Sequence, residues 1–122
     1  MFDLLRRAPA RFAKSFGYCW DALVVTVRKE ESFRLEMIAF VLLALVMVAC
    51  GWPWWKKTGM MAGYLLIPLV EVLNSAIEDV CDLVTKERNE LVKNAKDKGA
   101  LAVLAAIVFN ALLLATLILV DD

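Results

Sequence analysis

Three largely apolar stretches constrain what this chain can fold into; two are long enough to cross a membrane alone, and the second crosses only if it includes Glu71, Asn74 and Glu78. Residues 37–50 are apolar without a break, and Gly51-Trp52-Pro53-Trp54-Trp55 extends that stretch. Residues 100–120 are apolar except for Asn110 and Thr116. A helix of about 20 apolar residues spans the ~30 Å hydrocarbon core of a bilayer. The sequence therefore predicts an all-α membrane protein, a single domain over residues 1–122, with spans at about 35–55, 58–82 and 99–120.

Composition supports a membrane protein and excludes some partners. Of the 122 residues, 61% are hydrophobic, whereas soluble domains have about 45–50%. The 14 basic and 14 acidic residues cancel, so nothing favours a nucleic-acid partner. The chain has no histidine, so proton transfer must use a carboxylate, Lys, Tyr or Cys. The three cysteines are widely spaced, and we expect them to be reduced packing residues.

The charges predict how the chain sits in the membrane. Residues 1–30 mix arginines and lysines with Leu and Phe, which is typical of an amphipathic helix lying on a membrane surface. They contain no long apolar core, so a cleaved signal peptide is not expected. Lys and Arg concentrate before the first span and between the second and third. Because cytoplasmic segments are the more basic, we expect a cytoplasmic N-terminus and an external C-terminus.

The second span carries polar residues on one face. Glu71, Asn74, Ser75, Glu78 and Asp82 fall within one stripe at 100° per residue. A carboxylate in or near a bilayer costs several kcal/mol unless it is paired, which makes such residues functional candidates. The simpler interpretation is that these residues only mark where the helix leaves the membrane. Pro68 is expected to kink the helix just before Glu71.

Phosphoryl transfer is the chemistry that these residues could perform. Glu30 and Glu78 carry hard oxygen ligands suited to Mg²⁺, which usually takes one or two carboxylates and completes its shell with phosphate oxygens and water. Positioning and charge neutralisation supply most of the catalysis in such reactions. Glu71, deeper in the membrane, is then the candidate general base for a lipid hydroxyl. Arg11, Asn74 and Lys96 are the candidates to contact the phosphates.

Several motifs together resemble one family. The block Glu71-Val72-Leu73-Asn74-Ser75-Ala76-Ile77-Glu78, followed by Asp82 and Ala95-Lys96-Asp97, is similar to the signature of the prokaryotic integral-membrane diacylglycerol kinases. Gly17-Tyr18-x-Trp20 and Glu30-x-x-Phe33-Arg34-x-Glu36 match the amino-terminal part of that pattern. The resemblance implies three transmembrane helices plus an amphipathic surface helix, assembled as a homotrimer with shared active sites in the bacterial inner membrane. It also implies ATP with Mg²⁺ as the phosphoryl donor.

The resemblance also implies residue roles. It makes Glu71 the catalytic base and Glu30 and Glu78 the metal ligands. The residues it implies for the nucleotide site are Arg11, Tyr18, Asn74, Glu87, Lys96 and Asp97, and those for the lipid substrate are Glu71, Trp20, Phe33 and Arg34.

Three functions remain open from the sequence. Diacylglycerol kinase is the first, and undecaprenol kinase is the second because the same fold hosts both. Leu35 and Asn89 depart from residues frequent in diacylglycerol kinases. A small proton-coupled transporter is the alternative from another class, since acids within a membrane also build proton relays.

Overall fold

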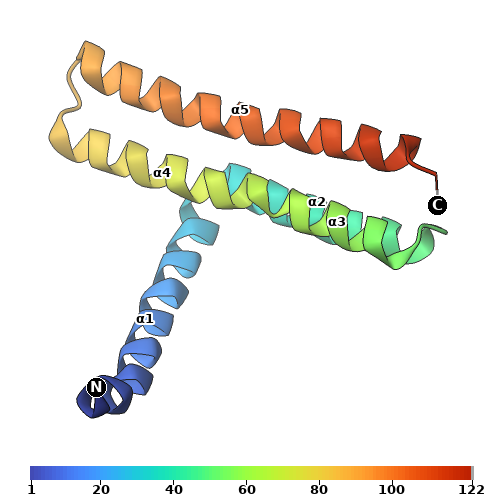
Figure 1. The fold of residues 1–122 in the computed structure, drawn as a ribbon. Coiled ribbons are helices and arrows are strands. Elements are labelled where there is room, and N and C mark those ends of the chain that lie inside the picture. Colours follow the sequence, from blue (N-terminus) through green and yellow to red (C-terminus); the bar gives the residue numbers. More distant parts are fainter. Residues whose placement is uncertain (122) are drawn as a thin grey trace. The chain divides into compact units, whose positions relative to one another are not determined.

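The computed structural model describes residues 1–121, and every regular element in them is an α-helix (Figure 1). Contacts divide the chain into two units, Met1–Glu31 and the residues from Ser32 onward. The five helices, in chain order, are α1 (Phe2–Lys29), α2 (Glu31–Ala49), α3 (Trp54–Tyr64), α4 (Leu66–Val84) and α5 (Glu90–Leu119).

The first unit is a single uninterrupted helix. Helix α1 runs through both Pro9 and Gly17. None of its residues is buried. The helix stops at Glu30, whose backbone is extended. A helix of 28 residues with no buried side chain gains little stability from packing within its own unit.

Three helical segments of the second unit are long and apolar enough to cross a membrane. They are Glu31–Ala49, Trp54–Val84 and Glu90–Leu119, with mean hydropathies of 2.1, 1.6 and 2.7. The predicted three spans therefore correspond to three helical segments. The first apolar stretch does not stay helical to Trp55, however. Helix α2 ends at Ala49, and Pro53 begins α3, because proline fits before the first helical turn, where no backbone N–H needs a partner.

The second span is interrupted earlier than expected. The sequence placed a kink just before Glu71, but the break between α3 and α4 lies at Leu65. The proline ring at residue 68 crowds the carbonyl four residues earlier, that of Tyr64, which is the last residue of α3. Hydrogen bonds from Leu65 N to Met61 O and from Leu69 N to Leu65 O continue across the break. The two helices therefore follow one line in Figure 1.

The third apolar stretch is the end of a longer helix. Helix α5 begins at Glu90, nine residues before the predicted span, so Lys96 and Asp97 lie on a helix and not in a loop. Asn89 caps it, because its side-chain oxygen accepts hydrogen bonds from Leu91 N and Val92 N. Hydropathy marks the edge of a membrane, whereas polar residues with good helix propensity extend the helix beyond that edge.

Packing within the second unit is formed mainly by α5. Helices α4 and α5 lie side by side and run in opposite directions (Figure 1). The buried residues of α5 are Gly99, Ala106, Asn110 and Leu117, a spacing that keeps them on one face. Leu117 joins Met47 and Met60 in a small core. Small residues along such a face let helix backbones approach closely, which drives association inside membranes.

Two polar contacts connect helices away from this core. The buried Lys56 donates from Nζ to the carbonyl of Val120, just after α5, at 2.6 Å. Its ammonium lies 5.8 Å and 5.4 Å from the ring centroids of Trp52 and Trp55. The Tyr64 hydroxyl donates to the backbone carbonyl of Glu36 at 2.9 Å, which links α3 to α2. Lys56 therefore anchors the end of α5 that is remote from the α4–α5 loop.

Candidate active site

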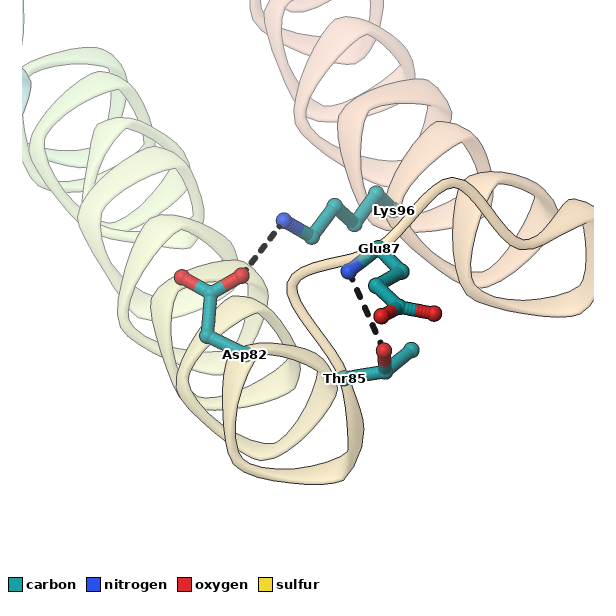
Figure 2. A network of polar contacts seen from close by, with 4 residues as sticks. All are labelled: Asp82, Thr85, Glu87 and Lys96. Carbon is teal, nitrogen blue, oxygen red and sulfur yellow. Dashed lines mark hydrogen bonds and ion pairs between the residues drawn. The ribbon is translucent and has the colours of Figure 1, made fainter.

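The end of α4 and the start of α5 bring the predicted charged residues together. Figure 2 shows Lys96 reaching across from α5 to Asp82 near the end of α4. Lys96 Nζ lies 2.7 Å from Asp82 Oδ1, and both side chains are partly exposed. Glu78, one turn before Asp82, also attracts Lys96 electrostatically. An ion pair at such an exposed place contributes little to stability because water screens it, so Lys96 can leave Asp82 for a phosphate at little cost.

The short loop between the two helices forms a hollow beside Lys96. The loop is held by Glu87 N, which donates to Thr85 Oγ1 at 3.1 Å (Figure 2), and by the Asn89 cap. A cavity of about 270 Å³ is lined by side chains of the loop and the first turns of α5, among them Glu87, Arg88, Asn89, Lys93, Lys96 and Asp97. Three of the predicted nucleotide residues therefore line one polar surface hollow.

Asp97 is paired within its own helix. Its Oδ2 lies 2.6 Å from Lys93 Nζ, one turn earlier in α5, and both side chains are well exposed. This pair neutralises one lysine and one carboxylate at the hollow. Arg88 and Lys96 are the other cationic groups of the hollow, which also holds the acidic Glu87, and Lys96 is paired with Asp82. The phosphates of a nucleotide would be attracted to these two cations.

The stripe on α4 continues from this hollow toward the membrane interior. Glu71, Asn74 and Glu78 are spaced by three and four residues, so they share one face of the helix. Glu78 is exposed, whereas Glu71 and Asn74 are partly buried. The oxygen Oδ1 of Asn74 is buried without a hydrogen-bond partner, and it lies against Gly99 of α5. The side chains of the stripe therefore become less exposed from Glu78 toward Glu71.

Glu36 is a site candidate that the sequence reasoning did not select. Its carboxylate is close enough to Glu71 for the two charges to repel each other, and its Oε2 is buried without a hydrogen-bond partner. Its position one residue before the long apolar run was the available signal, because an acid there lies near the membrane boundary. Tyr64, which donates to the Glu36 backbone, was likewise read only as part of a span.

The other predicted site residues lie in the first unit or on α2. Arg11, Tyr18 and Trp20 are exposed residues of α1, and Glu30 follows its last residue. Phe33 is buried and Arg34 is exposed in the first turn of α2. That these residues act together with the stripe on α4 stays a prediction.

The donor atoms suit Mg²⁺. No group of three or more His, Cys, Asp or Glu side chains in residues 1–121 forms a ready-made metal site. Glu78 nevertheless presents an exposed carboxylate one turn from Asn74 and one turn from Asp82. Hard carboxylate oxygens are the protein ligands that Mg²⁺ takes, one or two at a time, when phosphates supply the others.

Comparison with known proteins decides the family. A family model described as "Prokaryotic diacylglycerol kinase" matches residues 17–119. The chain belongs to the prokaryotic diacylglycerol kinase family. It is 40% identical over 104 residues to the diacylglycerol kinase of Escherichia coli strain K12, covering 80% of each chain. It is 35% identical over 109 residues to the diacylglycerol kinase of Pseudomonas aeruginosa, covering 89% of each.

Membership in this family confirms the predicted lipid kinase. The family also includes an undecaprenol kinase, that of Bacillus subtilis strain 168, which is 31% identical over 105 residues and 84% of each chain. The transporter alternative has no counterpart among these relatives. The chain is therefore a multi-pass membrane enzyme that phosphorylates a lipid.

Proposed function

We propose that this chain transfers the γ-phosphoryl group of ATP to the hydroxyl of diacylglycerol and so makes phosphatidate. The observation that carries the proposal is the polar stripe of Glu71, Asn74 and Glu78, which ends beside the cationic hollow at Lys96. The two diacylglycerol kinases at 40% and 35% identity support the choice of lipid.

Glu71 is proposed as the general base. It lies seven residues, ~10 Å along the helix axis, before Glu78. That separation suits a lipid whose hydroxyl enters from the membrane while the nucleotide stays at the surface. The hydroxyl oxygen attacks the γ-phosphorus, its proton passes to the Glu71 carboxylate, and the bond to the ADP oxygen breaks. Partial burial of Glu71 keeps water away from the hydroxyl, which protects ATP from hydrolysis.

The remaining residues are proposed to bind and orient the nucleotide. Lys96 exchanges its contact with Asp82 for a phosphate oxygen, and Asn74 donates a hydrogen bond from its amide. Arg11, Tyr18, Glu87 and Asp97 complete the nucleotide contacts, while Trp20, Phe33 and Arg34 contact the lipid. Glu30 and Glu78 would hold Mg²⁺, which when bound neutralises charge on the transferring phosphoryl group.

The assembly that we propose is a homotrimer in the bacterial inner membrane. Helix α1 lies on the cytoplasmic surface as an amphipathic helix, with its N-terminus cytoplasmic and the C-terminus of the chain periplasmic. Few residues of the three spans are buried within one chain, between 11% and 17% of each apolar window. A span that carries two carboxylates on a largely exposed helix needs neighbours to shield them from lipid, which supports contact between copies.

The test is ATP-dependent lipid phosphorylation by the purified protein in mixed micelles. Dioleoylglycerol and undecaprenol are offered separately, at equal mole fraction, with radiolabelled ATP and excess Mg²⁺. We expect a higher kcat/KM for dioleoylglycerol. Glu71→Gln, prepared in the same way, is the matched control, because it keeps the size of the side chain and removes the base.

Three other outcomes would change the proposal. Faster phosphorylation of undecaprenol would replace diacylglycerol by undecaprenol, the substrate named for the Bacillus subtilis relative. Equal activity of wild type and Glu71→Gln would show that the base lies elsewhere. Phosphorylation of neither lipid by well-folded protein would refute the proposed substrate class.

A further inference from the structure

Gly99 lies on the buried face of α5, and its backbone does not require glycine. No glycine in residues 1–121 has a positive φ angle, so conformational freedom is not the reason for its presence. Inside a helix glycine is less favourable than alanine. A buried helical position that lacks a side chain therefore indicates that the space beside it is already occupied.

The occupant of that space is the Asn74 side chain. A Cβ atom on residue 99 would collide with Asn74 Oδ1, and it would lie 3.2 Å from Asn74 Cγ and 3.8 Å from Asn74 Cα. The α4 backbone is at ordinary van der Waals distance from that Cβ position, so the collision is with the short Asn74 side chain. Any side chain at residue 99 therefore turns the Asn74 amide away or separates the two helices.

The same contact determines which end of the amide faces α5. An asparagine side chain has an acceptor oxygen at one end and a donor nitrogen at the other. Asn74 Oδ1 is buried and has no hydrogen-bond partner. In Gly99, the Cα–H bond that a Cβ would replace points at this oxygen. Cα–H groups make weak contacts with oxygen atoms where helices pack closely. With the oxygen against Gly99, the donor nitrogen Nδ2 is the end of the amide that takes no part in this contact.

We propose that Gly99 is a positioning residue for the kinase reaction. It holds the Asn74 amide so that Nδ2 donates to a phosphate oxygen of the nucleotide, while Gly99 itself touches no substrate. The inference rests on the role proposed above for Asn74 in nucleotide binding. A displacement of ~1 Å in a positioning group can cost up to 10²-fold in rate, so one added methyl group is enough to expose the effect.

The chain offers a matched control at Gly63. A Cβ atom there would collide with the end of the Leu113 side chain and would lie 3.7 Å from Asn110 Oδ1. Gly63 thus also packs against α5, and the atoms nearest to that Cβ belong to Leu113 and Asn110, neither of which is a proposed site residue. Gly63→Ala adds the same methyl group to the same helix bundle, so it measures the effect of helix packing alone.

The experiment is a double-mutant cycle of Gly99→Ala and Asn74→Ala, with Gly63→Ala in parallel. Steady-state kinetics with Mg-ATP and dioleoylglycerol in mixed micelles are combined with thermal unfolding of the same samples. We expect Gly99→Ala to lower kcat/KM for ATP by ~10–100-fold while the KM for lipid changes less than ~2-fold. In the Asn74→Ala background the same change should cost less than ~3-fold, because the group on which Gly99 acts is gone. Gly63→Ala should stay within ~3-fold of wild type.

The outcomes separate this inference from the proposed function. Equal fold losses from Gly99→Ala with and without Asn74 would overturn the inference, as would an equal rise in the KM values for ATP and lipid. If Gly99→Ala alone does not fold, the variant Asn74→Ser is compared with the double variant Asn74→Ser/Gly99→Ala. Lower activity of the double variant than of Asn74→Ser would also overturn the inference. An inactive wild type would refute the proposed function, and the unfolding cycle would still test the contact. There Gly99→Ala should lower the melting temperature only when Asn74 is present.

Discussion

Lys56 allows a stability prediction to be worked out from its contacts. The residue is 3% exposed, and its ammonium donates to the Val120 carbonyl at 2.6 Å and lies within 6 Å of two tryptophan rings. Replacement by Met keeps the length of the side chain and removes the charge. A hydrogen bond involving a charged group contributes ~1.5–3 kcal/mol net. Each cation–π contact adds about 0.5–1 kcal/mol or more.

Methionine restores part of the stabilisation that is lost with the ammonium. A methionine sulfur regains ~0.3–1.5 kcal/mol against an aromatic ring, and the cost of burying a charge disappears. We therefore expect Lys56→Met to lower the free energy of unfolding by about 2 kcal/mol, a change of ~30-fold in the unfolding equilibrium. Activity at a temperature where the protein is folded should stay close to wild type, because Val120 lies at the end of α5 away from Lys96.

The assay is unfolding by sodium dodecyl sulfate in mixed detergent micelles, followed by tryptophan fluorescence. Lys57→Met is the matched control, since Lys57 is the next residue, is partly exposed and makes no ion pair in the described part of the chain. We expect the control to change the free energy of unfolding by less than ~0.5 kcal/mol. Equal destabilisation by the two replacements, or none by either, would refute the reasoning. The contacts of the buried ammonium would then make no net contribution to the free energy of unfolding.

The remaining predictions concern the site. Glu71→Gln should lower kcat by ~10²–10⁴-fold with Mg-ATP binding retained, as measured by turnover and by nucleotide titration; unchanged turnover would exclude Glu71 as the base. Asp82→Asn should leave the melting temperature close to that of wild type, because the pair with Lys96 is exposed, whereas Lys96→Met should raise the KM for ATP. Glu30→Ala and Glu78→Ala should each shift the Mg²⁺ midpoint of activity, and the double variant should lose little more than either one. Additive losses with an unchanged midpoint would remove Glu30 from the site.

The spans and the motif could be predicted because their signals are local. An apolar run is visible wherever it occurs, and the spacing of Glu71, Asn74 and Glu78 alone puts them on one helix face. The ends of the helices were harder to predict from the sequence. The third span was predicted to begin at about residue 99, but Asn89 caps a helix that already includes Lys96 and Asp97. The kink was placed next to Pro68, although a proline disturbs the carbonyl four residues earlier.

What could not be predicted depends on contacts between helices. Gly99 opened the last apolar stretch in the sequence, and nothing local indicated that it would lie against Asn74, 25 residues earlier. Nothing in the sequence around Lys56 and Lys57 indicated that Lys56 would be buried, with two tryptophan rings and a helix end beside it. Such contacts follow from how α5 packs on α3 and α4, which a single sequence does not specify.

The sparse burial within the spans has a consequence for how this family diverges. No side chain in residues 1–121 is completely buried, and most large apolar side chains of the spans are exposed. Where such a side chain faces lipid, selection can act on its hydropathy but hardly on its shape, since a fluid acyl chain fits Leu, Ile, Val or Phe alike. Those positions should therefore drift quickly among apolar residues, while the narrow seam of Gly99, Ala106 and Asn110 drifts slowly. Sequence identity between relatives would then understate how closely their backbones agree.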